Sequence, residues 1–232
     1  MTIGGVHTAA LTSDGQLFTF GLGKDGRLGH GNDHDQLSPK RVVGLEHHSI
    51  VQVACGGHHT GALTAEGEVY TFGFDDDGRL GHNCTGHVLS PKQVEALAGT
   101  HIRQISCGCW HSAALSTNDE LYTWGSNKSG QLGHGHKKSV PFPQMAMQKK
   151  GGGITMVACG TAHTAVLLQN GQVFTWGKAE DGRLGYESKE DQTTPKLVNL
   201  KGHVIHQVVC GVHNTAFLTR SSSIMDKKAH KY

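Results

Sequence analysis

The chain has little proline, few aromatic residues and no long apolar run. Only 5 of its 232 residues are proline, which excludes a proline-rich linker, and aromatic residues make up 6%. No apolar segment approaches the roughly 18 residues that a membrane-spanning helix needs. The formal net charge of +2 at pH 7 gives no dominant sign. We therefore expect no membrane span and no nucleic-acid partner.

We also expect no secretory leader. The first residues, MTIGGVHTAALT, contain neither a basic segment nor an apolar core of the kind that signal peptides have. Six cysteines without such a leader indicate reduced thiols rather than a disulfide framework. We expect a cytoplasmic or nuclear protein.

Glycine, by contrast, is abundant, with 33 residues. Tight turns between strands need glycine where the backbone angle φ is positive. Hydrophobic residues make up 36% of the chain, and they show no helical periodicity. This composition favours an all-β fold.

A 52-residue repeat runs through almost the whole sequence. Its histidines recur every 52 residues without insertion or deletion, and so do its aromatic–glycine and Leu-Gly pairs. A fifth, partial copy follows after a one-residue deletion, because Cys159 and Cys210 are 51 residues apart. Repeats of this length are typical of propellers and other repeat folds. The repeat anchors are His7, His59, His111, His163 and Asn214.

Each copy has the pattern of four short antiparallel strands, which is the size of one propeller blade. In the second copy we expect them at Ile50–Cys55, Thr60–Thr64, Glu68–Phe72 and Pro91–Val94. The first copy provides three strands and the last copy two, so about four blades are present. We assign residues 1–219 to propeller repeats and residues 220–232 to a flexible tail or linker.

The motif C-G-x-x-H-T/S-x-x-L, followed by G-x-L/V-F/Y-T-F/W-G and G-R/Q-L-G, resembles the repeat of the regulator of chromosome condensation family. The second copy carries it as Cys55-Gly56, His59-Thr60, Leu63, Gly67, Phe72-Gly73 and Gly78-Arg79-Leu80-Gly81. The resemblance covers about residues 3–219 and implies a β-propeller, which in this family typically has seven blades.

About four blades leave three arrangements open. We favour a partial propeller that belongs to a longer one. The alternatives are a closed ring of four blades and a ring completed by further blades or another chain. A partial propeller leaves strand edges unpaired.

The repeated residues are first candidates for structural roles, since a chemical site seldom needs four identical copies. We expect the repeated histidines to bond the backbone between blades. Arg27, Arg79 and Arg183 recur in one turn, where a nearby carboxylate or carbonyl would pair with them. The repeated cysteines are expected to be buried thiols between blades, at Cys55, Cys107, Cys159 and Cys210.

The segment Asp75-Asp76-Asp77-Gly78 lacks the ligand spacing of a calcium loop, and we interpret it as a solvated turn. No nucleophile–base pair and no metal-ligand spacing is present. We therefore predict no catalytic, cofactor-binding or metal-binding residues and no cofactor.

Function is then expected in variable loops on a rigid frame. These loops are Asp33–Gln36, Asn83–Val88, His136–Ser139 and Glu187–Gln192. The resemblance implies a non-catalytic protein-interaction scaffold. The alternative that it implies is a guanine-nucleotide exchange factor or regulator for a small GTPase. Light sensing by clustered tryptophans is not favoured, because Trp110 alone precedes a repeat histidine.

Overall fold

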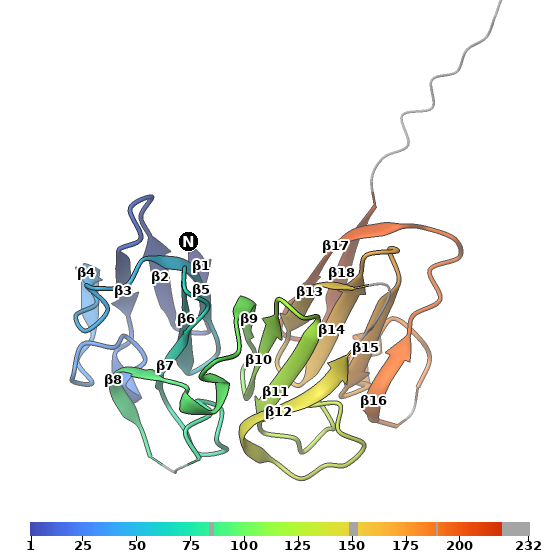
Figure 1. Ribbon diagram of the computed structural model, residues 1–232. Helices are drawn as coiled ribbons and strands as arrows, with labels where there is room; N and C mark the ends of the chain where they lie inside the picture. Colours follow the sequence, from blue (N-terminus) through green and yellow to red (C-terminus); the bar gives the residue numbers. More distant parts are fainter. Residues whose placement is uncertain (84–85, 149–152, 189, 220–232) are drawn as a thin grey trace, which may run out of the picture.

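The computed structural model describes residues 1–83, 86–148, 153–188 and 190–219. Its strands form four sheets of four antiparallel strands and one sheet of two strands, arranged in chain order along an arc (Figure 1). Within these residues, no strand of the first sheet pairs with the last sheet. The predicted partial propeller of about four blades is confirmed, and a closed four-blade ring is not formed. The predicted tail, residues 220–232, lies outside the described residues.

The strand bounds repeat from blade to blade. Blade one has β1 (Thr2–Ile3), β2 (His7–Leu11), β3 (Leu17–Gly21) and β4 (Gln36–Arg41); blade two has β5 (Ile50–Cys55), β6 (His59–Thr64), β7 (Val69–Gly73) and β8 (Val88–Gln93). Blade three has β9 (Ile102–Cys107), β10 (His111–Ser116), β11 (Glu120–Gly125) and β12 (Val140–Gln148); blade four has β13 (Ile154–Cys159), β14 (His163–Leu168), β15 (Val173–Gly177) and β16 (Gln192–Leu197). The fifth sheet has β17 (Ile205–Cys210) and β18 (Thr215–Thr219).

Two expectations about the strands need correction. The sequence predicts three strands in blade one, whereas Thr2 and Ile3 pair with β2 as a fourth. The outer strand of blade two begins at Val88 and not at Pro91, because Val88 pairs with Gly73. Three short 3-10 helices complete the described chain, at Lys24–Gly26, Glu95–Leu97 and Glu180–Gly182, and none of the described helices could cross a membrane.

The second strand of each inner blade is buried along its whole length. All six residues of β6, β10 and β14 are buried, whereas β18 is mostly exposed. The reason is stacking. In β6, Ala62 belongs to a cluster with residues of blade one and Leu63 to a cluster with residues of blade three, so neighbouring blades cover both faces of the strand. A strand covered on both faces has no polar side to alternate with its apolar side.

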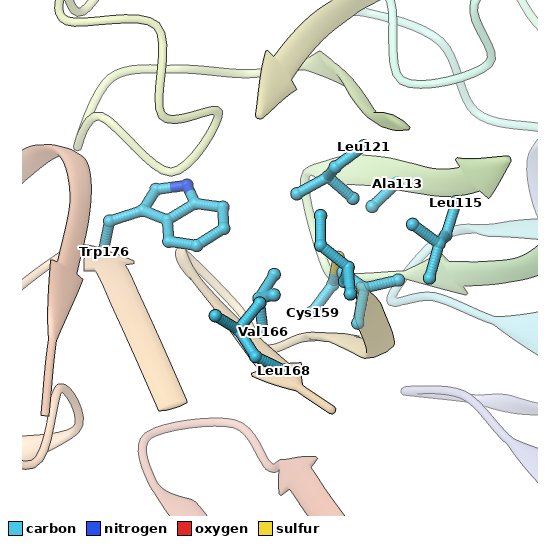
Figure 2. Packing of buried hydrophobic residues seen from close by; sticks show 9 residues of the cluster. Ala113, Leu115, Leu121, Cys159, Val166, Leu168 and Trp176 are labelled. Carbon is cyan, nitrogen blue, oxygen red and sulfur yellow. The ribbon is translucent and has the colours of Figure 1, made fainter. Parts of the chain in front are cut away.

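The hydrophobic core lies between blades. Figure 2 shows one cluster, in which Leu121 of blade three faces Val166 and Trp176 of blade four. The indole of Trp176 is fully buried and lies against Gly133, where an added Cβ would be 2.8 Å from the indole nitrogen. The glycine of the Leu-Gly turn is therefore needed because an aromatic ring of the next blade occupies the space of a side chain. The same ring-on-glycine contact recurs at Gly29 with Phe72 and at Gly81 with Trp124.

Polar clamps fix the register of one blade on the next. Gln52 donates from Nε2 to the carbonyl of Ile105 (3.0 Å) and accepts from the amide of the same residue (2.9 Å). Gln104 makes the equivalent pair with Val157, at 3.1 Å each. A paired amide of this kind satisfies two backbone groups at once, so sliding of the blades would leave four polar groups unpaired.

Candidate interaction face

The repeated histidines connect neighbouring blades through a hydroxyl group. His59 Nε2 lies 2.8 Å from Ser112 Oγ, and that hydroxyl donates to the carbonyl of Arg79 at 2.8 Å. Since the hydroxyl hydrogen goes to the carbonyl, the histidine carries its proton on Nε2 and donates it. The expected position between blades is confirmed, but the partner of Nε2 is a side chain and not the backbone. The other pairs are His7–Thr60, His111–Thr164 and His163–Thr215.

Burial keeps these imidazoles neutral. Desolvation lowers the pKa of His7 to about 4, that of His111 to about 3 and that of His163 to about 4, with neighbouring positive groups adding to it. Desolvation also lowers the pKa of His59 well below its ordinary value. A base with such a pKa and no open side is unsuited to proton transfer near neutral pH.

The repeated cysteines lie between blades and are protonated. Cys55 and Cys159 belong to the hydrophobic clusters, and burial raises the pKa of both thiols, that of Cys55 to about 12. Burial likewise raises the pKa of Cys107 and Cys210 to about 12. A thiol with so high a pKa is a poor nucleophile and a poor metal ligand. No group of three or more potential metal ligands occurs among the described residues.

The acidic turn of blade two differs from its expected form. Asp76 is exposed, but Asp75 is fully buried and accepts a hydrogen bond from the amide of Leu80 at 2.9 Å. Desolvation raises the pKa of Asp75 to about 6. The interpretation of this segment as a solvated turn is therefore wrong for Asp75.

Two adjoining clefts open at the end of the blades where second strands begin and third strands end. His59 pairs with Gly73 there, so the residues before each repeat histidine lie beside the turn that follows each aromatic–glycine pair. The first cleft, about 600 Å³, spans blades one to three; the second, about 350 Å³, spans blades two to four and the last sheet. We call this end the loop face. The clefts share Asp77, Trp110 and Lys128.

The side chains that line the clefts change from blade to blade. At the position before the repeat histidine the chain has Val6, His58, Trp110, Ala162 and His213. At the position after the aromatic–glycine pair it has Leu22, Phe74, Ser126 and Lys178. A larger hollow of about 830 Å³ beside Thr219 has no Asp, Glu, Lys, Arg or Trp among the described residues that line it. The loop face is thus where varied apolar, aromatic and charged groups converge.

Arg79 lies at the centre of the aromatic part of the loop face. Its guanidinium carbon is 4.7 Å from the centroid of the Phe74 ring and 4.8 Å from that of the Trp110 indole. The His58 ring lies 5.9 Å from Phe74 and 5.4 Å from Trp110, so it joins the two rings. Cation–π contacts of this kind stabilise a guanidinium that has left water.

The three turn arginines are held differently. Arg27 donates from Nε to the carbonyl of Lys24 (2.7 Å) and from Nη2 to Asp25 (2.8 Å). Arg183 makes the same two bonds with Glu180 and Asp181, at 2.8 Å each. Arg79 donates only from Nη1, to the carbonyl of Cys109 (3.1 Å), while its Nε and Nη2 have no hydrogen-bond partner. The expected pairing of these arginines thus describes Arg27 and Arg183 fully and Arg79 in part.

The four variable loops singled out from the sequence contribute none of their described residues to the lining of the two clefts. Among those described residues, His87 contacts the aromatic cluster, and its ring stacks on Phe74 with the centroids 4.9 Å apart. The signal that could have found the face is adjacency. The varying positions stand directly beside the repeated histidine and the repeated aromatic–glycine pair, so the rigid frame fixes their backbone.

Comparison with known proteins agrees with this architecture. A family model described as the RCC1-like domain matches residues 1–225. The chain belongs to the RCC1-like domain family. Among curated RCC1-like relatives, it is 36% identical over 234 residues to the ultraviolet-B receptor UVR8 of Arabidopsis thaliana, covering 100% of this chain and 53% of that protein. It is 40% identical over 220 residues to the human E3 ubiquitin-protein ligase HERC2, covering 93% of this chain and 5% of that protein.

Solved structures of other proteins resemble the fold closely. Human WBSCR16 matches with a TM-score of 0.87 and 27% identity, over 95% of this chain and 57% of that one. Yeast RCC1 (Prp20), solved with Kap60 bound to it, matches with a TM-score of 0.79 and 24% identity, over 94% of this chain and 53% of that one. The chain therefore spans about half the length of UVR8 and of these structures. The predicted family is confirmed.

Proposed function

We propose that this RCC1-like chain is a non-catalytic interaction scaffold that binds a protein partner through the loop face. The observation that carries the proposal is a contrast between a repeated frame and a pair of adjoining clefts. Two positions of the repeat that line these clefts carry a different residue from blade to blade. Aromatic residues and arginine meet in these clefts. Residues of these two kinds are enriched where protein interfaces have their strongest contacts.

The state of the repeated histidines and cysteines supports the non-catalytic part of the proposal. The repeated histidines are neutral and enclosed, and the repeated thiols are protonated. The five cysteines that the structure describes are free thiols, which supports a reducing compartment such as the cytoplasm or nucleus. The ligase activity named for HERC2 is not carried over, since the chain covers 5% of that protein.

Affinity capture with matched variants tests the proposal. Wild-type protein, Trp110→Ala in the clefts and Leu37→Ala on the outer strand of blade one would each be used as bait, and captured proteins identified by mass spectrometry. Leu37 is fully exposed on β4, so it controls for loss of a surface apolar side chain. We expect one partner to be retained by Leu37→Ala and lost by Trp110→Ala. Equal capture by all three baits contradicts the proposal.

An exchange assay separates the alternative function. The second candidate is a guanine-nucleotide exchange factor or regulator for a small GTPase. Prp20p of Saccharomyces cerevisiae, which matches this chain with a TM-score of 0.66, binds the proteins Gsp1p and histones. Release of a fluorescent GDP analogue from a panel of small GTPases would be followed with and without this chain. Acceleration that depends on the loop face would identify an exchange factor, and unchanged release favours the scaffold.

A further inference from the structure

Building on the proposed function, we infer that Arg79 receives a carboxylate of the partner, from an Asp or Glu side chain that has an apolar neighbour. The site is the edge of the Arg79 guanidinium between Phe74 and Trp110, inside the first cleft. It specifies the chemistry of the partner, which the proposed function leaves open.

Arg79 has two hydrogen-bond donors that no acceptor in the described chain uses. Arg79 is fully buried, and its Nε and Nη2 atoms make no hydrogen bond. The nearest carboxylate oxygen, Asp77 Oδ2, is 3.6 Å from Nη2, which is too long for a hydrogen bond. Leaving buried donors of a charged group unpaired is unfavourable, by about 1–3 kcal/mol for a neutral group and more for a charged one. A hydrogen-bond acceptor that reached Nε and Nη2 would therefore stabilise the Arg79 guanidinium.

The sibling arginines show which acceptor fits. In Arg27 and Arg183 the same two atoms, Nε and Nη2, are occupied by a carbonyl and a carboxylate of their own turn. These two donors are parallel and match the two oxygens of one carboxylate. Nε and Nη2 are thus paired within the chain in Arg27 and Arg183, whereas in Arg79 of blade two they remain available to a partner.

A difference in backbone conformation explains why Asp77 does not hydrogen-bond to Arg79. Asp25 and Asp181 adopt left-handed backbone angles, with φ of 62° and 59°, and their carboxylates fold back onto the arginine. Asp77 is not among the described residues with positive φ. Its other oxygen, Oδ1, lies 3.6 Å from Nζ of Lys128 in blade three. The carboxylate of Asp77 thus lies between Arg79 and Lys128, and it is too far from either for a hydrogen bond.

The surroundings select the kind of acid. The Phe74 and Trp110 rings both contact the guanidinium, so polar contact is left to the parts of the group that the rings do not cover. Both rings are half-buried, and one of them must turn aside to admit a carboxylate. The displaced ring then offers apolar surface to the neighbour of the acid. Asp76 and Asp77 at the rim repel a run of acidic residues, which favours a single carboxylate.

Selection of peptides followed by a double-mutant cycle tests this inference. A phage library of random 12-residue peptides would be selected on the wild-type chain, and synthetic copies measured by fluorescence polarisation. We expect selected peptides to share an Asp or Glu beside an apolar residue. Arg79→Gln, or replacement of the acid by its amide, is expected to weaken binding roughly 10- to 100-fold. Combining the two should weaken it little further, because both remove the same contact.

A charge control accompanies the cycle. The chain itself has Gln131 at the equivalent position of blade three, so Arg79→Gln is compatible with the fold. Arg103→Gln removes a positive charge on β9, away from both clefts. This variant should keep affinity within about twofold of wild type, against the larger loss for a paired charge.

The outcomes separate this inference from the function beneath it. Peptides that bind through Trp110, as judged by their loss with Trp110→Ala, but need neither an acid nor Arg79 overturn the carboxylate site and leave the interaction face standing. Failure of every selected peptide to depend on Trp110 overturns both.

Discussion

Trp110 and His111 are neighbours in the chain and belong to two different regions of the molecule. His111 is fully buried between blades and bonded to Thr164, and four copies of the repeat have the same residue there. Trp110 is half-buried in both clefts, and no other copy has tryptophan at its position. One residue therefore holds the frame while the next gives the surface its identity. A position that repeats between blades and a position that varies between them can thus be direct neighbours in the chain.

The largest effect that we expect is a loss of stability in acid, caused by the buried histidines His7, His59, His111 and His163. Above pH 6.5 these histidines are neutral whether the chain is folded or unfolded, so their contribution is complete. Between pH 6.5 and about 4 the unfolded chain takes up protons that the folded chain refuses, and stability is lost as the pH falls. The expected loss is on the order of 2 kcal/mol per histidine by pH 5. Urea unfolding from pH 7.5 to 5 measures it.

A matched variant tests the source of this pH dependence. His111→Asn imitates Asn214, the residue that the fifth copy has at this position, and removes one titrating group. Its free energy of unfolding should fall less steeply with acid than that of wild type. An identical slope for the two proteins would assign the acid sensitivity to other groups.

Truncation of the two neighbours should separate their roles. His111→Ala removes the bond to Thr164 and leaves a cavity between blades, so we expect a loss of about 3 kcal/mol in the free energy of unfolding. Trp110→Ala, at a half-exposed position, should lose about 1 kcal/mol or less yet abolish partner capture. Chemical denaturation at pH 7.5 measures both. A larger loss for Trp110→Ala would contradict the division between frame and surface.

Asp75→Asn should stabilise the protein at neutral pH by about 1–2 kcal/mol. Asn127, its counterpart in blade three, accepts from Leu132 and donates from Nδ2 to the carbonyls of His136 and Lys138. A carboxylate has no such hydrogen to donate.

The pH dependence of Asp75 has the opposite sign to that of the histidines. Its folded pKa, about 6, is above the ordinary 3.8, so its contribution is complete below about pH 4 and lost as the pH rises through about 6. Asp75→Asn should remove this part of the pH profile. Thermal unfolding of both proteins at pH 5 and pH 7.5 checks it: an equal gain at the two pH values would contradict the assignment.

The smallest expected effect compares two arginines of the same motif. Arg183→Gln breaks the bonds to Glu180 and Asp181 and should lose about 1 kcal/mol of stability. Arg79→Gln breaks one hydrogen bond, to the carbonyl of Cys109, and two cation–π contacts, but it also removes two buried donors that have no partner, so the net loss should be smaller. Urea denaturation of the pair measures the difference. A greater loss for Arg79→Gln would mean that this arginine serves the frame, as its siblings do.

Much of the frame was predictable because its causes are local and repeated. The 52-residue spacing predicts four strands per blade, and alternation and turn residues place them within a few positions. The start of β8 was misplaced because Pro91 was taken as its first residue, while Val88 pairs with Gly73. The short β1 was missed because two residues give no periodic pattern. The histidine positions were predicted, but not their hydroxyl partners, which come from another copy of the repeat.

The candidate site was less predictable for a physical reason. Arg27, Arg79 and Arg183 have the same motif, G-R-L-G, and nothing within that motif distinguishes them. The distinction arises from the backbone angle two residues earlier and from Lys128 and Trp110, which lie on another blade. Contacts between blades are invisible to a reading of one repeat at a time.

The sequence by itself determined the family, the blade unit and the rows of residues that stack one blade on the next. It could do so because each blade repeats the same local rules of strand, turn and packing glycine. Only the tertiary structure decided that the row beside each histidine opens into a cleft, and that one buried guanidinium keeps two donors unpaired. Those properties depend on distances between side chains about 30 or more residues apart, which are set by how neighbouring blades stack.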